Sequence, residues 1–169
     1  MPVAIISDIH NNEVNLQKVL NYCKDNEVKT IICCGDLASL ETLDFLNDNF
    51  SGNILYTFGN ADYDDLRDLE EQKKYKNTYL FKDFGEAVIE KKNVAFTHFP
   101  DIAKSLARTG KYDFVFYGHT HKPWEAMSGK CKLLNPGTVA GEIYLPTFAV
   151  WETETAKFEL LRIHSLKNS

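Results

Sequence analysis

The segment FVFYGHTHKPW, residues 114–124, ends an apolar run with a glycine and two histidines. Residues 114–117 have the aromatic and β-branched composition of a buried strand, which Gly118 interrupts. His119 and His121 follow, with one residue between them. In an extended segment, side chains two residues apart point to the same side, so both imidazoles are expected to reach one small cavity. One such pair is by itself a weak indication of a metal site.

Four other apolar runs show the same pattern, in which a residue able to bind a metal ion follows the strand directly. These residues are Asp8 and His10 after 2–6, Asp36 after 29–34, Asn60 after 53–58, and His98 after 93–97. In open α/β sheets the carboxyl ends of the strands border the crevice in which ligands bind. Agreement at five strand ends therefore predicts one shared metal site. The remaining histidine, His164, is expected in the last strand without a functional role.

Alternating strand and helix patterns in the first half predict a parallel sheet covered on both faces. We expect strands at 2–6, 29–34 and 53–58, helices at 11–26 and 40–49, and a charged helix at 62–76. The second half has one expected helix, at 100–110, and is richer in strands. Strands are expected at 78–81, 86–90 and 93–98 before the helix. Five more are expected after it, at 113–117, 123–127, 130–134, 147–152 and 157–163, and these are predicted to be mostly antiparallel because their connections are short. Residues 1–169 are predicted to form a single α/β layered domain.

The composition narrows the class of protein. The chain has 169 residues and a formal net charge of −5, and proteins that hold nucleic acid by general electrostatics need a basic face. We therefore expect no general nucleic-acid binding. The start lacks the basic segment of a signal peptide, and no apolar run approaches the roughly 20 residues of a membrane-spanning helix. A cytoplasmic protein without a membrane partner is predicted.

The pattern of the cysteines does not indicate a metal site, a disulfide or a catalytic thiol. Cys23, Cys33, Cys34 and Cys131 form no CxxC pair and are predicted to be reduced core thiols. No GxSxG motif occurs, and Cys33 and Cys34 lie inside an apolar strand rather than at a helix N-terminus. Serine or cysteine nucleophilic catalysis is therefore not expected.

Six motifs, SDIHNN, CGD, FGNAD, THFP, YGHTH and NPGT, resemble in order and spacing those of the calcineurin-like metallophosphoesterases. The likeness spans residues 8–138 and is closest to the small single-domain phosphodiesterase branch. It implies a four-layer α/β/β/α sandwich with two mixed β-sheets and an active site at the carboxyl ends of the strands. It also implies two divalent metal ions between the sheet ends.

By motif position, the resemblance implies two sets of three metal ligands and one shared ligand. Asp8, His10 and His121 would bind one ion, Asn60, His98 and His119 the other, and Asp36 would bridge them. The residues expected to be catalytic are Asp36, Asn60, His98 and His119.

A pair of metal ions suits the hydrolysis of an anionic phosphate ester, because the ions can share an activated water and clamp the phosphoryl oxygens for in-line attack. Oxygen ligands mixed with imidazoles, without thiolate, suit divalent transition metals better than Ca²⁺. We expect two Mn²⁺ ions, with Ni²⁺, Fe²⁺, Co²⁺, Zn²⁺ or Mg²⁺ as alternatives. The predicted function is hydrolysis of a small phosphodiester by a metal-bridging hydroxide.

Three further residues each have two interpretations. Asn12 could bind the substrate phosphate or cap the first helix, and Asn135 could bind substrate or shape the Pro-Gly turn. We predict Asn12 and Asn135 as substrate-binding residues. Asp62 could orient water or cap the helix that follows it. Specificity should come from the loops at 37–43, 99–103 and 122–125, whose chemistry does not name a substrate.

Two positions depart from the family pattern. Ala61 stands where the family often has His or Cys, a residue thought to protonate the leaving oxygen, and general acid catalysis is worth about 10²–10⁴-fold. Phe99 stands where glycine is usual, which would make the second metal's pocket narrower or more apolar. Both changes favour a second hypothesis, a catalytically weak or inactive protein-interaction module like the retromer scaffold subunit of similar fold. Trp124 and Tyr144 could lie at a homodimer contact or be ordinary partly buried side chains.

Overall fold

The computed structural model describes residues 1–62 and 74–166. The charged helix expected at 62–76 falls almost wholly outside the described residues. The other predicted helices and strands are present close to their expected bounds. Within the described part of the chain, no helix is both long enough and apolar enough to cross a lipid bilayer.

The first sheet has six strands and is parallel through its centre. Its order is β11 (Lys157–Arg162), β10 (Thr147–Glu152), β1 (Pro2–Ile6), β2 (Thr30–Cys33), β3 (Asn53–Thr57) and β4 (Thr78–Phe81). Strands β1, β2 and β3 pair in parallel, as the alternation of strands and helices predicted, and β4 also pairs in parallel with β3. Strand β10 pairs antiparallel with both β1 and β11, so the sheet is mixed.

The second sheet has five strands and is also mixed. Its order is β5 (Phe84–Ile89), β6 (Lys92–Thr97), β7 (Phe114–Phe116), β9 (Cys131–Asn135) and β8 (Trp124–Ser128). The pairs β5–β6 and β8–β9 are antiparallel, whereas β6–β7 and β7–β9 are parallel. The prediction of mostly antiparallel pairing among the strands after residue 113 was therefore wrong for β7 with β9. A helix between β6 and β7 returns the chain to the same end of the sheet, which is how parallel neighbours are connected.

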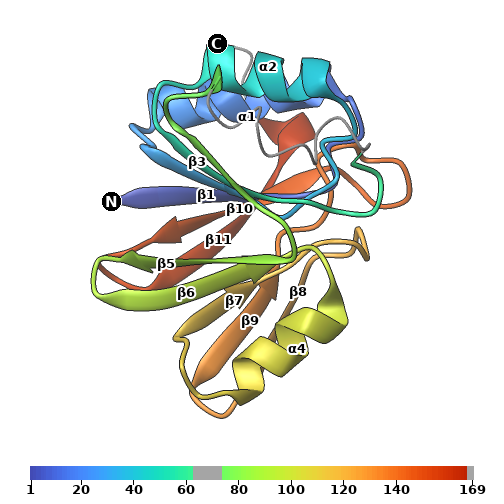
Figure 1. The fold of residues 1–169 in the computed structure, drawn as a ribbon. Helices are drawn as coiled ribbons and strands as arrows, with labels where there is room; N and C mark the ends of the chain where they lie inside the picture. The colour runs from blue at the N-terminus through green and yellow to red at the C-terminus, as the bar shows by residue number, and fades with distance from the viewer. Residues whose placement is uncertain (63–73, 167–169) are drawn as a thin grey trace.

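The helices cover the outer faces of the two stacked sheets (Figure 1). Helices α1 (Glu13–Asp25) and α2 (Leu40–Asn49) lie on the first sheet, and α4 (Pro100–Arg108) lies on the second. The result is a four-layer α/β/β/α sandwich with two mixed sheets, the architecture that the resemblance implied.

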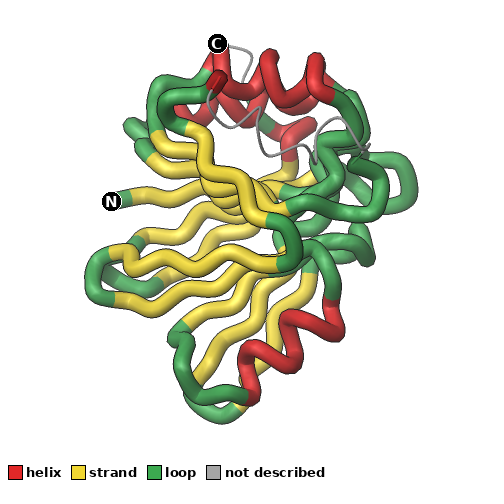
Figure 2. Tube along the Cα trace, viewed as in Figure 1, coloured by secondary structure: helices red, strands yellow, loops and turns green. Residues whose placement is uncertain are grey.

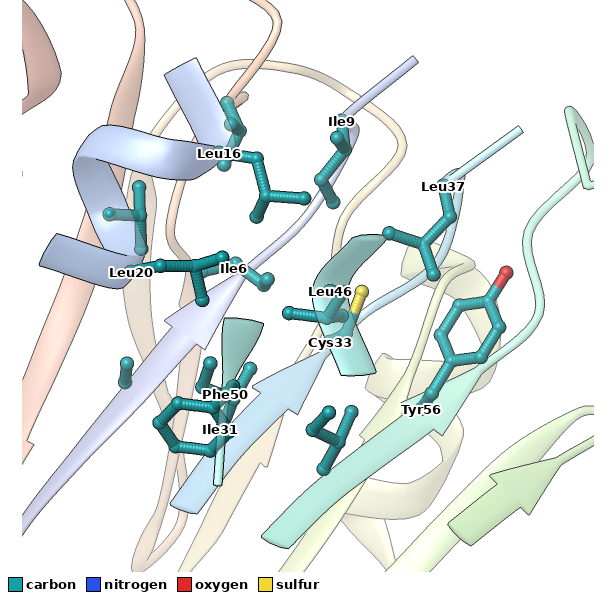
Figure 3. Packing of buried hydrophobic residues seen from close by; sticks show 14 of the residues in the cluster. Ile6, Ile9, Leu16, Leu20, Ile31, Cys33, Leu37, Leu46, Phe50 and Tyr56 are labelled. Atoms are coloured by element: carbon teal, nitrogen blue, oxygen red, sulfur yellow. The ribbon is translucent and has the colours of Figure 1, made fainter. Parts of the chain in front are cut away.

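Strand β1 is buried on both faces, and its successive residues alternate between two cores. Ala4 and Ile6 pack beneath α1 and α2, whereas Val3 and Ile5 pack between the sheets. Figure 3 shows the helix side, where Leu16 of α1 lies near Ile6. Burial on both faces explains why this strand is a continuous apolar run with polar residues only beyond its end.

The carboxyl ends of several strands and most of the longer loops lie on one side of the sandwich, the right-hand side in Figure 2. This side carries the chemistry predicted from the sequence. His164 does not belong to it. The last strand ends at Arg162, and His164 lies exposed in a short 3₁₀ helix, Ile163–Ser165, so its expected place in the strand was wrong.

Candidate metal centre

The structure brings all seven predicted ligands into one connected cluster at five strand ends. Asp8 and His10 follow β1, Asp36 follows β2, Asn60 follows β3, His98 follows β6, and His119 and His121 follow β7. Each has a nitrogen or oxygen atom within 3.4 Å of one belonging to another member. Because these strands come from both sheets, the cluster lies where the two sheets meet.

Three of these residues, Asp8, His10 and His121, form what we call the Asp8 group. Asp8 Oδ1 lies 3.2 Å from His121 Nε2 and 3.9 Å from His10 Nε2, and the two Nε2 atoms are 3.4 Å apart. The Asp8 side chain is buried, whereas the side chains of His10 and His121 are 20% and 13% exposed. The hydrogen bond to the Asp8 carboxylate raises the pKa of His121.

The His98 group consists of Asn60, His98 and His119. Asn60 Oδ1 lies 3.0 Å from His98 Nε2 and 2.9 Å from His119 Nδ1, and these two nitrogens are 3.2 Å apart. His98 is fully buried, and its Nδ1 lies 2.8 Å from the carbonyl oxygen of Cys34. A carbonyl bonded to the far nitrogen is the usual means of orienting a metal-binding imidazole. His98 Nε2 is thereby held toward its group.

Asp36 Oδ2 lies between the two groups, 3.7 Å from His10 Nε2 and 3.3 Å from His98 Nε2. Its Oδ1 accepts a hydrogen bond from the N–H of Ala61. Burial alone would raise the pKa of Asp36, but the hydrogen bond and charge of His98 outweigh burial and lower this pKa. Burial likewise opposes a charge on His98, and Asp36 overcomes it and raises the pKa of His98. The Asp36 carboxylate is therefore ionised and within reach of both groups.

The donor atoms fit divalent metal ions. Ligand atoms about 2.0–2.2 Å from one ion lie roughly 3–3.5 Å from each other, which is close to the spacing within each group. Two sets of three, Asp8 with His10 and His121 and Asp8 with Asp36 and His98, have ligand atoms that all lie within 4.8 Å of one another. Among the described residues, the buried Asp8 Oδ1 has no hydrogen-bond donor besides the His121 imidazole, whose Nε2 lies 3.2 Å away. A cation held by the Asp8 group would satisfy it.

The loops that carry the ligands are curled rather than extended. Asp8, His10, Asp36, His119 and His121 all have positive φ, from 45° to 72°. The extended geometry predicted for the Asp8–His10 and His119–His121 pairs was therefore wrong, although both pairs reach the cluster. Residues other than glycine keep this conformation where neighbouring structure holds them. Here the His10 N–H donates to the Asp36 carbonyl at 3.0 Å, which ties the two loops together.

Glycines precede Asn60 and His119 because backbone and ligand approach each other closely there. A β-carbon at Gly59 would overlap the carboxylate of Asp36, and one at Gly118 would overlap Ser7 and crowd the carboxylate of Asp8. A larger residue at either glycine would displace a ligand. The FGN and YGH motifs therefore have a packing explanation.

Asp62 organises the ligand loops, a role that the sequence did not reveal. Its buried carboxylate accepts hydrogen bonds from the backbone N–H groups of Asp36 at 3.0 Å, Ala38 at 2.9 Å and Gly59 at 2.6 Å. It therefore joins the loop after β2 to the loop after β3. Two of these partners lie 24 and 26 residues away in sequence, so no local pattern indicates them. Membership of the FGNAD motif was the only signal.

The two residues predicted to bind substrate also support the protein itself. Asn12 caps α1 and donates its side-chain amide to the carbonyl of Ala140. Asn135 is buried, and its amide joins the Gly118 carbonyl to the N–H of Gly137. Both side chains hold backbone beside the cluster. Substrate binding by either one stays a prediction.

The four cysteines are buried and free, as predicted. Burial raises the pKa of Cys33 and Cys34 well above the ordinary thiol value. A thiol held in its neutral form is a poor nucleophile, which agrees with assigning the chemistry to the Asp and His cluster.

Comparisons with known proteins agree with this geometry. The family model described as the calcineurin-like phosphoesterase superfamily domain matches residues 1–156. A phosphodiesterase of Methanocaldococcus jannaschii is 29% identical over 161 residues, which cover 94% of this chain and 96% of the relative.

Solved structures add the likeness in three dimensions. The structure of a novel archaeal phosphodiesterase superposes with a TM-score of 0.86 at 28% identity, covering 96% of this chain and 99% of that one. Vps29 from Entamoeba histolytica shares the fold, with a TM-score of 0.68 at 19% identity and coverage of 96% and 99%. With a family match over most of its length and a cluster suited to metal ions, the chain belongs to the calcineurin-like phosphoesterase superfamily and is a metal-dependent phosphoesterase.

Proposed function

We propose that this protein hydrolyses small phosphodiesters with two divalent metal ions, one held by the Asp8 group and one by the His98 group. The observation that carries this proposal is the position of Asp36 Oδ2, within 3.7 Å of His10 Nε2 and 3.3 Å of His98 Nε2. One carboxylate placed between two ligand sets is what a shared metal ligand requires. The phosphodiesterase name of the Methanocaldococcus jannaschii relative supports the substrate class.

When bound, such ions supply positive charge for the phosphoryl oxygens and make a water molecule acidic enough to attack near neutral pH. The residues of the chain position this chemistry. Asp36 sets the separation of the two groups, and the Cys34 carbonyl holds His98 in its ring orientation. The exposed Asn60 and His119 lie on the solvent side, where the ester would approach for in-line displacement.

Ala61 decides which leaving groups are suitable. Its N–H donates to Asp36 Oδ1, but its methyl side chain has no proton to give to a departing oxygen. Esters of acidic phenols need no such proton, whereas alkyl esters do. We therefore expect aryl phosphodiesters to be hydrolysed much faster than alkyl ones.

The test is hydrolysis of bis-p-nitrophenyl phosphate by protein loaded with Mn²⁺, with Ni²⁺, Fe²⁺, Co²⁺, Zn²⁺ and Mg²⁺ compared side by side. We expect the highest rate with Mn²⁺ and loss of activity in EDTA. Replacing Ala61→His should raise the rate on alkyl phosphodiesters selectively, by at most about 10²–10⁴-fold. Equal rates of the native protein on aryl and alkyl esters would contradict the role assigned to Ala61, and a metal-loaded protein inactive on all esters would contradict the proposed function.

The second candidate function is a protein-interaction module with little or no catalysis. Ala61 and Phe99 favour it, as does the fold shared with Vps29. The complete set of seven ligands opposes it, because a scaffold has no evident need for four histidines at strand ends. Metal content close to zero in the purified protein, together with inactivity after metal loading, would favour the module. We propose a small substrate rather than nucleic acid, in keeping with the net charge of −5.

A further inference from the structure

A pocket of about 310 Å³ borders the His98 group, and none of its lining residues is a predicted metal ligand. Phe58, Gly59, Lys82, Asp83 and Phe99 line it. Gly59 immediately precedes Asn60, and Phe99 immediately follows His98, so the pocket begins where the ligands end. Its volume is at the lower end of the roughly 300–1,000 Å³ of small-molecule sites, which suits one ring system rather than a polymer.

Phe99 lines this pocket, and its ring also contacts two of the predicted ligands. Its centroid lies 5.0 Å from that of His98 at an interplanar angle of 87°, and 5.7 Å from that of His119 at 52°. These two ring contacts restrict the position of the Phe99 side chain beside the His98 group. A planar group entering the pocket would find a fixed aromatic surface on which to stack.

The lining of the pocket also carries one charge of each sign, Lys82 and Asp83. Lys82 is exposed, and among residues 1–62 and 74–166 it has no ion-pair partner. The neighbouring Asp83 adds an exposed carboxylate, while its backbone carbonyl accepts a hydrogen bond from Thr97. A purely apolar substituent would leave both charges unused, and a second phosphate would be repelled by Asp83. A planar group with a hydrogen-bond acceptor for Lys82 and a donor for Asp83 would use both side chains.

We propose that this pocket binds a heteroaromatic substituent of the phosphodiester, of the size and polarity of a nucleobase. The ring would stack on Phe99, accept a hydrogen bond from Lys82 and donate one to Asp83. This inference rests on the proposed phosphodiesterase function and names the class of its substrate. Phe99, at a position where the resembling family usually has glycine, becomes a specificity residue rather than an obstruction.

The experiment uses two substrates with the same p-nitrophenolate leaving group, thymidine 5′-(p-nitrophenyl phosphate) and methyl p-nitrophenyl phosphate, on Mn²⁺-loaded protein. Thymine offers both an acceptor and a donor, and the common leaving group removes any effect of Ala61. We expect kcat/KM to be at least about 10-fold higher for the thymidine ester, since stacking on an aromatic side chain is worth that much. Phe99→Ala and Lys82→Met should each bring the ratio of the two kcat/KM values down toward one. Tyr79→Ala and Lys157→Met, an exposed aromatic and an exposed lysine outside the pocket, should leave the ratio unchanged.

The ratio separates a specificity role from a structural one, because a disturbed metal centre would slow both esters equally. A native ratio near one, or a ratio insensitive to Phe99→Ala and Lys82→Met, would overturn the pocket assignment while methyl ester hydrolysis still supported the proposed function. If neither ester is hydrolysed, calorimetric binding of thymidine 5′-phosphate against methyl phosphate decides the matter. Preference for the nucleotide that Phe99→Ala removes would support the pocket, and equal binding would overturn it.

Discussion

The Asp8 group and the His98 group differ in how far the protein itself holds their ligands. His98 is fully buried, and its Nδ1 is fixed by the Cys34 carbonyl. His121 is 13% exposed, and its buried Nδ1 has no hydrogen-bond partner among the described residues. Partners behind a ligand raise metal affinity by setting the ring orientation in advance. The difference indicates that the His98 group is prepared for an ion, whereas the Asp8 group depends more on the ion to order it.

The largest effect is expected when Asp36, the residue proposed to serve both groups, is removed. We expect Asp36→Ala to lower turnover of bis-p-nitrophenyl phosphate by about 10²–10³-fold, because charge stabilisation of this kind is worth that much. Bound metal, measured by mass spectrometry after gel filtration, should fall at both groups. Asp44→Ala is the matched control, since Asp44 is a carboxylate paired with Lys74 away from the centre. A large loss in the control, or full metal content in Asp36→Ala, would refute the shared role.

Removing one imidazole from each group in turn should show that the two groups contribute differently to stability and to metal binding. His98→Ala removes a fully buried ring and its hydrogen bond to the Cys34 carbonyl, which keeps a second hydrogen bond from Ser7 Oγ. Urea unfolding in EDTA should therefore show a loss of about 0.5–1.5 kcal/mol for this hydrogen bond. His121→Ala removes a partly exposed ring that is held only through its Nε2, 3.2 Å from Asp8 Oδ1, and should cost less. We also expect His121→Ala to retain the ion of the His98 group at equal metal concentration. Equal losses of stability and metal in the two variants would show that the groups are held alike.

A substitution at Asp62 should affect the two groups unequally. Asp62 accepts hydrogen bonds from the backbone of Asp36 and of the loop that carries Asn60, but from no residue of the Asp8 group. Asp62→Asn keeps the shape of the side chain and replaces one acceptor oxygen by an N–H donor that faces backbone N–H groups. We expect a loss of about 1–3 kcal/mol in the free energy of unfolding. Metal affinity should fall by about 10–100-fold, mainly at the His98 group. Unchanged affinity there would assign Asp62 a purely structural role.

The smallest effect is a pH dependence of stability in EDTA. The pKa values of His98 and His121 are raised in the folded protein, so their contribution is complete below the unfolded value of about 6.5. It is lost as pH rises through the folded values, so thermal stability in EDTA should fall as pH rises above about 6.5. The pKa of Asp36 is lowered, so its contribution is already complete in this range and does not offset the fall. His98→Gln and His121→Gln should each flatten the curve, and stability that rises over this range would contradict these shifts.

The sequence was most informative where a run of buried residues stops. Both faces of β1 are covered, so Val3, Ala4, Ile5 and Ile6 are all apolar, and Asp8 stands out beyond them. The same contrast indicated the other predicted ligands. It could not give the curled backbone at the ligand loops, because that conformation depends on bonds between loops that are distant in the chain.

Two other features escaped prediction for a related reason. The role of Asp62 depends on N–H groups up to 26 residues away. The parallel pairing of β7 with β9 arises because β8, which lies between them in the chain, takes the edge of the sheet instead. Both are properties of the assembled fold. Short-range patterns, such as the capping role considered for Asp62, describe only a residue's immediate neighbours.

The ligands run from position 8 to position 121 and come from both sheets. A growing chain that has released only its first hundred residues already carries Asp8, His10, Asp36, Asn60 and His98, yet it lacks the two remaining histidines and most of the second sheet. Binding of both proposed metal ions would therefore be a late event in the maturation of the protein. Once captured, the ions would fasten the two sheets to each other at their shared edge, so that chelators lower the melting temperature of the whole sandwich.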